Sequence, residues 1–178
     1  IFNIETARGC NFKRIDGYTF SPDEARILIQ TQTNHIYRHS FTAEYHIYSR
    51  KNNKLQPLSE NGPQQQPIFS PDGTMIAWQS MERDGYESDW NRLYVMNLAT
   101  GEKRFLSRAF DSNVDEFVWM PDGKGFYFSG VWHGTTMIYS LDFEGNVCQL
   151  TEGQYDFGGI TLMGDQILCK RPSMAEAD

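Results

Sequence analysis

One short phrase recurs along the chain and constrains its fold more than any other feature. It begins at Ser21, Ser70 and Met120, each time as Ser-Pro-Asp or Met-Pro-Asp between two apolar runs. Proline pre-sets the backbone for the second position of a type I turn, and aspartate caps the backbone that follows. Each phrase therefore predicts a β-hairpin, and a hairpin that returns about every 50 residues predicts the blades of a β-propeller.

The repeats divide the chain into units of four strands. Runs beside each Pro-Asp turn are apolar on both faces and suit inner strands, whereas alternating stretches such as residues 43–49 suit outer strands. The chain is thus predicted to be all-β, a β-propeller of four-stranded blades with about four blades. We expect residues 1–16 to supply the outer strands of a blade, residues 17–66, 67–115 and 116–157 to form one blade each, residues 158–170 to supply inner strands, and residues 171–178 to form a tail.

Charge, hydropathy and cysteine spacing exclude several kinds of partner. The 16 basic and 23 acidic residues give a net charge of −7, which argues against a nucleic-acid partner. No apolar run could span a membrane, and the first residues lack the pattern of a signal peptide. Cys10, Cys148 and Cys169 are too widely spaced for a metal knuckle, so at most one bridge and more simply three separate thiols are expected.

Two groups of polar residues invite a metal hypothesis. His35, His39 and His46 are spread over a loop and a strand, a spacing that does not converge on one tetrahedral zinc ion. The acidic stretch 82–89 offers hard oxygen atoms but lacks the register of an EF-hand calcium loop. We therefore predict no metal and no cofactor, with these residues on solvated loops.

Residues 18–58, and above all the run YRHSFTAEY at 37–45, resemble an early blade of the N-terminal propeller of dipeptidyl peptidase IV-type serine peptidases, in the prolyl oligopeptidase family. From about Pro67 onward, runs such as NRLYVMNLATGEKRFL are more similar to the propellers of acylaminoacyl-peptidase-like members of the same family. The two resemblances together cover nearly the whole chain. Because they point to two branches, they suggest a chimera.

The resemblance implies a non-catalytic domain that covers a peptidase active site. The chain contains no Gly-x-Ser-x-Gly nucleophile motif, so no catalytic residue is assigned and no activity of its own is expected. The paired glutamates that hold the substrate's amino terminus in dipeptidyl peptidases have no counterpart, because Glu82 and Glu87 are separated. By resemblance, the parent protein would be periplasmic or secreted, and a peptide substrate would reach this domain through a hydrolase domain.

Arg38 is the leading substrate-binding candidate. The match of YRHSFTAEY places it where an arginine of dipeptidyl peptidases reaches the carbonyl groups of the bound peptide. A guanidinium suits that role because its rigid fork donates several hydrogen bonds and keeps its charge. His39 is a weaker candidate beside it, and Trp132 and His133 are weaker candidates on a glycine-flanked loop that either lines the substrate mouth or caps a blade edge.

Two functions remain open at this point. The chain is either the gating and peptide-positioning propeller of such a peptidase or a free-standing, natural or engineered, propeller that binds proteins. The family's propeller has eight blades, so four would form half of the ring. We therefore expect a homodimer, in which the C-terminal hairpin of one copy pairs with the N-terminal strands of the other, in preference to a four-bladed ring closed within one chain.

Overall fold

The computed structural model describes residues 2–35, 41–60, 64–81 and 90–171. In these residues fourteen strands form four antiparallel sheets, so the all-β prediction is confirmed. Blade 1 consists of β1 (Gly17–Phe20), β2 (Arg26–His35), β3 (Phe41–Ser49) and β4 (Lys54–Pro57); blade 2 of β5 (Gln65–Phe69), β6 (Met75–Ser80), β7 (Arg92–Asn97) and β8 (Lys103–Phe105); blade 3 of β9 (Glu116–Trp119), β10 (Gly125–Trp132), β11 (Thr135–Asp142) and β12 (Val147–Gln149); and β13 (Gly158–Met163) pairs with β14 (Gln166–Lys170).

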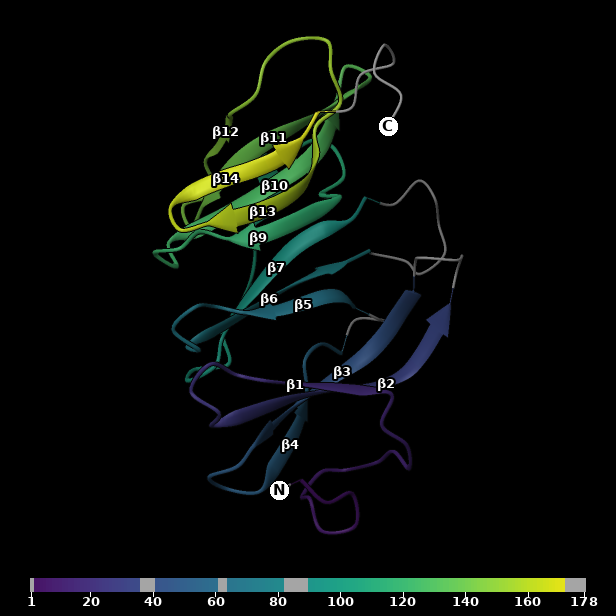
Figure 1. Ribbon diagram of the computed structural model, residues 1–178. Coiled ribbons are helices and arrows are strands. Elements are labelled where there is room, and N and C mark those ends of the chain that lie inside the picture. The colour runs from purple at the N-terminus through teal and green to yellow at the C-terminus, as the bar shows by residue number, and fades with distance from the viewer. Residues whose placement is uncertain (1, 36–40, 61–63, 82–89, 172–178) are drawn as a thin grey trace.

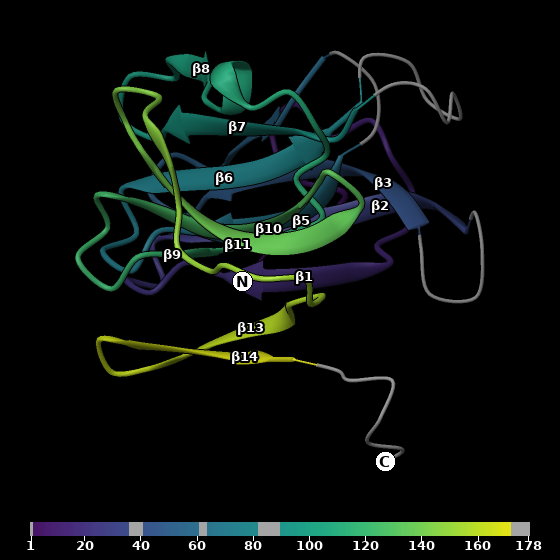
Figure 2. The same ribbon diagram turned by 90° about the horizontal axis from the view of Figure 1, so that it is seen from above.

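The sheets are stacked in chain order, from blade 1 beside the N-terminus to the β13–β14 hairpin beside the C-terminus (Figure 1). Seen from above, the strands of successive blades run across the view in similar directions (Figure 2). A single short 3₁₀ helix, η1 (Ser107–Ala109), follows β8 in the described part. No helix there is long and apolar enough to cross a bilayer.

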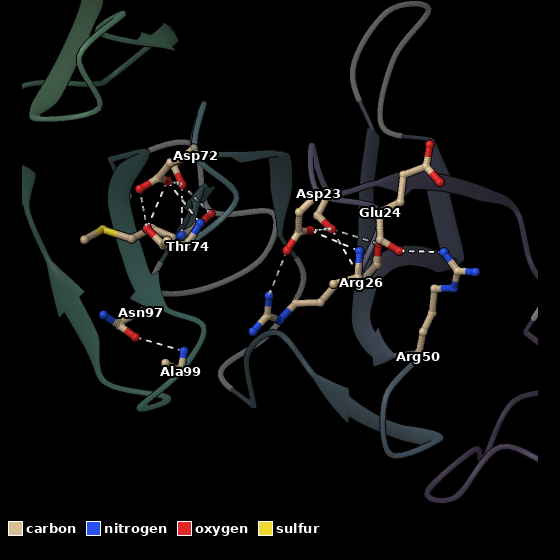
Figure 3. A network of polar contacts seen from close by, with 12 residues as sticks. Asp23, Glu24, Arg26, Arg50, Asp72, Thr74, Asn97 and Ala99 are labelled. Atoms are coloured by element: carbon tan, nitrogen blue, oxygen red, sulfur yellow. Dashed lines mark hydrogen bonds and ion pairs between the residues drawn. The ribbon is translucent and has the colours of Figure 1, made fainter.

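The recurring phrase forms the turn between the first and second strands of each blade. In blade 1 the Ser21 hydroxyl donates to Asp23 Oδ1 at 2.6 Å, and the same oxygen accepts the amide of Ala25 at 3.0 Å. Blade 2 repeats the first bond, from Ser70 to Asp72 at 2.6 Å. The two turns lie close together (Figure 3). Gly73, in the turn of blade 2, has a φ of +70° and lies next to the side chain of Asp23 in the turn of blade 1.

Apolar residues fill the space between the blades. Inner runs are apolar on both faces because a sheet inside the stack packs against a neighbour on each side. Trp119 shows this arrangement well: its side chain is 4% exposed, and its indole N–H donates to the Ile68 carbonyl of blade 2 at 3.0 Å. One cluster joins blades 1 and 2 through Leu28, Ala43, Tyr45, Ile47, Leu58, Phe69, Ile76, Trp78 and Met96, and a second joins blades 2 and 3 through residues that include Leu93, Val95, Phe117, Trp119, Phe126 and Phe128.

The prediction that residues 1–16 supply two outer strands is wrong for the described residues 2–16. They form turns whose only contact of the strand type is an isolated parallel bridge from Arg8 to Lys54. Their apolar side chains, among them Phe2, Phe12 and Ile15, pack instead on the face of blade 1 that no other described sheet covers. The segment therefore covers an open sheet face, because burying that apolar face is favourable whether or not a strand forms.

The β13–β14 hairpin is attached to blade 3. The Glu116 carboxylate accepts hydrogen bonds from the backbone amides of Gly159, at 3.2 Å, and Ile160. The described chain thus holds three complete blades and one two-stranded sheet, and it lacks the N-terminal strand pair on which the expected homodimer was built. The homodimer itself stays a prediction.

Candidate functional site

The two ends of the blades carry different connections. We call the end with the Pro-Asp turns the turn edge, and the opposite end, where the second strand of each blade leads to the third, the 2–3 edge. The turn edge lies on the left of Figure 1 and the 2–3 edge on the right. At the 2–3 edge, β2 ends at His35, β6 at Ser80 and β10 at Trp132. The candidate site is this edge, because Trp132 and His133 lie there and a groove adjoins the end of β2 and the start of β3.

Arg38 and His39 lie in residues 36–40, outside the described residues, between the end of β2 and the start of β3. In blade 3, Trp132 is the last residue of β10, and His133 follows it in the turn to β11. Of the four predicted residues, the structure thus places Trp132 and His133 at the 2–3 edge, and Arg38 and His39 fall outside the described residues.

The Trp132–His133 connection is a tight turn that projects its side chains. His133 and Gly134 have φ values of +51° and +84°, as a two-residue turn of type I′ requires. The indole of Trp132 is 45% exposed, and its ring meets the His133 imidazole edge to face at 4.8 Å. The turn therefore offers an exposed aromatic pair, available to a partner or ligand.

A groove of about 810 Å³ lies beside the 2–3 edge of blade 1. One wall comes from the segment before β1 and the other from β2 and the start of β3. The lining residues are Asn11, Phe12, Lys13, Arg14, Asp16, Gln30, Thr31, Gln32, Thr33, His35 and Phe41. The groove therefore adjoins both ends of the segment that contains Arg38.

Asp16 joins the two walls of this groove. Its Oδ2 accepts the Thr33 amide at 2.9 Å, and its Oδ1 lies 2.9 Å from Nε of Arg14. The hydrogen bond from Thr33, with a smaller contribution from the Arg14 charge, holds the pKa of Asp16 below its ordinary value. Asp16 is therefore ionised near neutral pH and fixes the segment before β1 against β2.

A β-bulge shapes β2 at the groove. The pairing of β2 with β3 shifts register between Thr31 and Asn34, and Gln32 has a φ of +50°. The Gln32 amide group donates to Glu44 Oε2 on β3 at 2.7 Å. A bulge changes which way the following residues point, so it re-aims the end of β2 relative to the groove.

The sequence did not single out Asp16, Gln32 or Thr33. A signal for Asp16 was available: it precedes the Asp of its Pro-Asp turn by the same number of residues as Asp115 does in blade 3. No comparable signal marked the bulge, because the residues around it fit an ordinary strand pattern.

The histidines of blade 1 occupy separate surroundings. His46 is buried, with Nδ1 lacking a partner and its ring 4.9 Å from that of Phe12. Burial lowers the pKa of His46, and the Glu44 charge opposes this effect. The His35 ring lies 5.9 Å from that of Phe41. Among the described residues, which leave out His39, no group of three or more His, Cys, Asp or Glu side chains could hold a metal ion.

Comparison with known proteins identifies relatives along most of the chain. Residues 21–108 match the family described as the dipeptidyl peptidase IV N-terminal region. Dipeptidyl-peptidase 5 of Porphyromonas gingivalis is 38% identical over 169 residues, which cover 92% of this chain and 25% of that protein. Its counterpart in Porphyromonas endodontalis is 36% identical over 141 residues, covering 78% of this chain and 20% of that protein.

Solved structures share the fold at lower identity. Dipeptidyl peptidase 4 of P. gingivalis has a TM-score of 0.67 and 22% identity, covering 85% of this chain and 27% of that one. The β-propeller domain of the Trilobed protease from Pyrococcus furiosus has a TM-score of 0.58 and 19% identity, covering 83% of this chain and 42% of that one. At these identities the likeness concerns the fold alone.

These matches bear on two of the sequence interpretations. The resemblance to dipeptidyl peptidase propellers is confirmed. The relative from P. gingivalis aligns with residues on both sides of Pro67, so a chimera is not required to explain the chain. The chain spans about a quarter or less of the length of these curated relatives.

Proposed function

Because the chain is an N-terminal propeller segment of the dipeptidyl peptidase IV family, we propose that it positions peptide substrate for a catalytic domain and has no hydrolytic chemistry of its own. The 2–3 edge is the surface that performs this task. Arg38 binds carbonyl groups of the peptide, and the Trp132–His133 turn contributes an aromatic contact further along the edge.

One observation carries this proposal. Trp132 and His133 lie at the 2–3 edge, and a groove of about 810 Å³ at the same edge is lined in part by His35 and Phe41, which flank the Arg38 segment in the sequence. Loops on a rigid scaffold are where binding residues are concentrated, because they can vary without disturbing the core. An arginine there is suited to peptide carbonyls, since its fork donates several hydrogen bonds from one rigid group.

Peptide binding to the 178-residue chain tests the proposal. We take the octapeptide of four Val-Thr repeats, with a free amino end, as the probe and measure its dissociation constant by isothermal titration calorimetry. Arg38→Ala removes a charge-assisted hydrogen-bond donor and is therefore expected to raise the dissociation constant about tenfold. Arg50→Ala is the matched control, because Arg50 donates to the Glu24 carbonyl at the turn edge (Figure 3).

The proposal predicts that Arg50→Ala leaves the dissociation constant within about twofold of the parent chain, since remote surface substitutions have small effects. Equal losses in both variants, or no measurable binding by the parent chain, would contradict it. In parallel, the chain is expected to release no p-nitroaniline from dipeptidyl substrates. Release that a serine-directed inhibitor blocks would show that the chain carries a nucleophile of its own.

A further inference from the structure

Strand β2 extends past its neighbour β1. β1 pairs with β2 only from Ile27 to Gln30, whereas β3 continues to pair with β2 as far as His35. In the described part of the chain, no strand pairs with the last residues of β2 on the side of β1. The β2–β3 hairpin therefore has a free edge at the 2–3 edge, on the right of Figure 1.

The bulge turns this free edge toward the groove. The carbonyl of Gln30 accepts the Asp16 amide on the side of β1, and the Thr33 amide points to the same side, where it donates to Asp16 Oδ2. Without the extra residue at the bulge, alternation would place Thr33 on the opposite side. Because N–H and C=O directions alternate along a strand, His35 also directs its backbone groups to the side of β1.

The groove along this edge has the size and lining for an extended chain. Its volume of about 810 Å³ lies within the usual range for ligand sites, and both of its walls are present in the described residues. Phe12 and Phe41 supply apolar surface, while Gln30 and Thr33 supply polar surface. A lining with both apolar and polar surface suits a strand, whose successive side chains point to opposite faces.

From these observations we infer that the free edge of β2 takes up an extended peptide as an additional β-strand. The peptide backbone pairs with His35 and with the Thr33 carbonyl, because the Thr33 amide already donates to Asp16. Every second side chain packs against the aromatic residues of the groove. Main-chain pairing gives affinity without strict sequence preference, as in other cases of strand addition. The inference rests on the proposed function and specifies the substrate form, an extended peptide segment.

Backbone N-methylation tests this pairing without altering the protein. Two versions of the (Val-Thr)₄ octapeptide are made, one methylated at the backbone nitrogens of the Val residues and the other at those of the Thr residues. In an added strand, only one of these sets of N–H groups faces the protein. We expect one version to bind about tenfold more weakly and the other to bind like the parent peptide, since the lost bonds contribute about 1 kcal/mol each.

Amide chemical shifts of the ¹⁵N-labelled chain locate the contact. The expected result is that the shifts of Thr33, Asn34 and His35 change on addition of the parent peptide and do not change with the weakly binding version. Equal binding by both methylated versions, or unchanged shifts at these residues, would overturn the strand addition. If Arg38→Ala still weakened binding of the parent peptide in that case, the proposed function would stand without the strand addition. Absence of binding by the parent peptide would contradict both.

Discussion

At the turn edge, the hairpin turns of blades 1 and 2 contain the same hydrogen bond, from Ser21 to Asp23 and from Ser70 to Asp72, each at 2.6 Å. At the 2–3 edge, the second and third strands are connected by residues 36–40 in blade 1, 81–91 in blade 2 and 133–134 in blade 3. These connections differ in length and in sequence. One set of connections is repeated and the other varies. The repeated set closes each hairpin in the same way, which leaves the varied set free to acquire binding residues.

The turn edge itself contains a useful exception in blade 3. Met120 stands where the other blades have serine, so no hydroxyl donates to Asp122, whose Oδ1 accepts the Lys124 amide at 3.0 Å. Blade 3 keeps the hairpin nonetheless, with four paired positions between β9 and β10. The serine therefore strengthens a turn that proline and aspartate already form.

The largest expected effect is a difference in unfolding free energy between substitutions of two tryptophans of blade 3, one in the interior and one at the 2–3 edge. Trp119→Ala removes a buried indole and its hydrogen bond to blade 2, and is expected to cost about 3–5 kcal/mol of unfolding free energy. Trp132→Ala alters a side chain that is 45% exposed, and is expected to change stability by about 0.5 kcal/mol or less. Urea unfolding measures both, and similar losses would erase the distinction.

A smaller effect compares two turns at the turn edge. Asp72 accepts hydrogen bonds from Ser70 Oγ and from the amide and hydroxyl of Thr74, whereas Asp122 accepts the amide of Lys124. Asp72→Ala is therefore expected to cost about 2 kcal/mol and Asp122→Ala about 1 kcal/mol, typical of the loss of a cap. Chemical denaturation of the two variants gives the difference. A larger loss for Asp122→Ala would contradict the role assigned to the serine.

The smallest effect concerns acid stability. The Ser21 and Ser70 hydroxyls are the main cause that lowers the pKa of Asp23 and Asp72 from the ordinary value of 3.8. A lowered folded-state pKa contributes stability that is present above about pH 4 and is lost as the pH falls through the folded-state value. The Ser21→Ala/Ser70→Ala variant is thus expected to lose less stability between about pH 5 and pH 2 than the parent chain.

Denaturant unfolding across this pH range measures the acid effect, with Ser129→Ala as a control away from the turns. A parallel pH dependence in the double variant and the parent chain would mean that the hydroxyls do not set these pKa values. The exposure of Asp23, at 46% for its side chain, keeps the expected difference small.

The fold could be predicted from local signals and the site only in part. The Pro-Asp phrase predicts hairpins because its backbone preferences are intrinsic to proline and aspartate, and its repetition locates three blades. Residues 2–16 resembled later outer strands, yet an apolar pattern does not say whether a segment pairs at an edge or covers a face. The bulge at Gln32 and the bond from Thr33 to Asp16 depend on tertiary contacts that no local pattern records.

Hydrogen exchange of the whole chain, with and without the (Val-Thr)₄ octapeptide, tests most directly the claim that one edge binds and the other supports. We expect bound peptide to slow amide exchange at least about threefold at His35, because pairing protects backbone amides. Exchange in the turns at residues 21–25, 70–74 and 120–124 is expected to stay unchanged. Protection confined to those turns, with none at the 2–3 edge, would contradict the account.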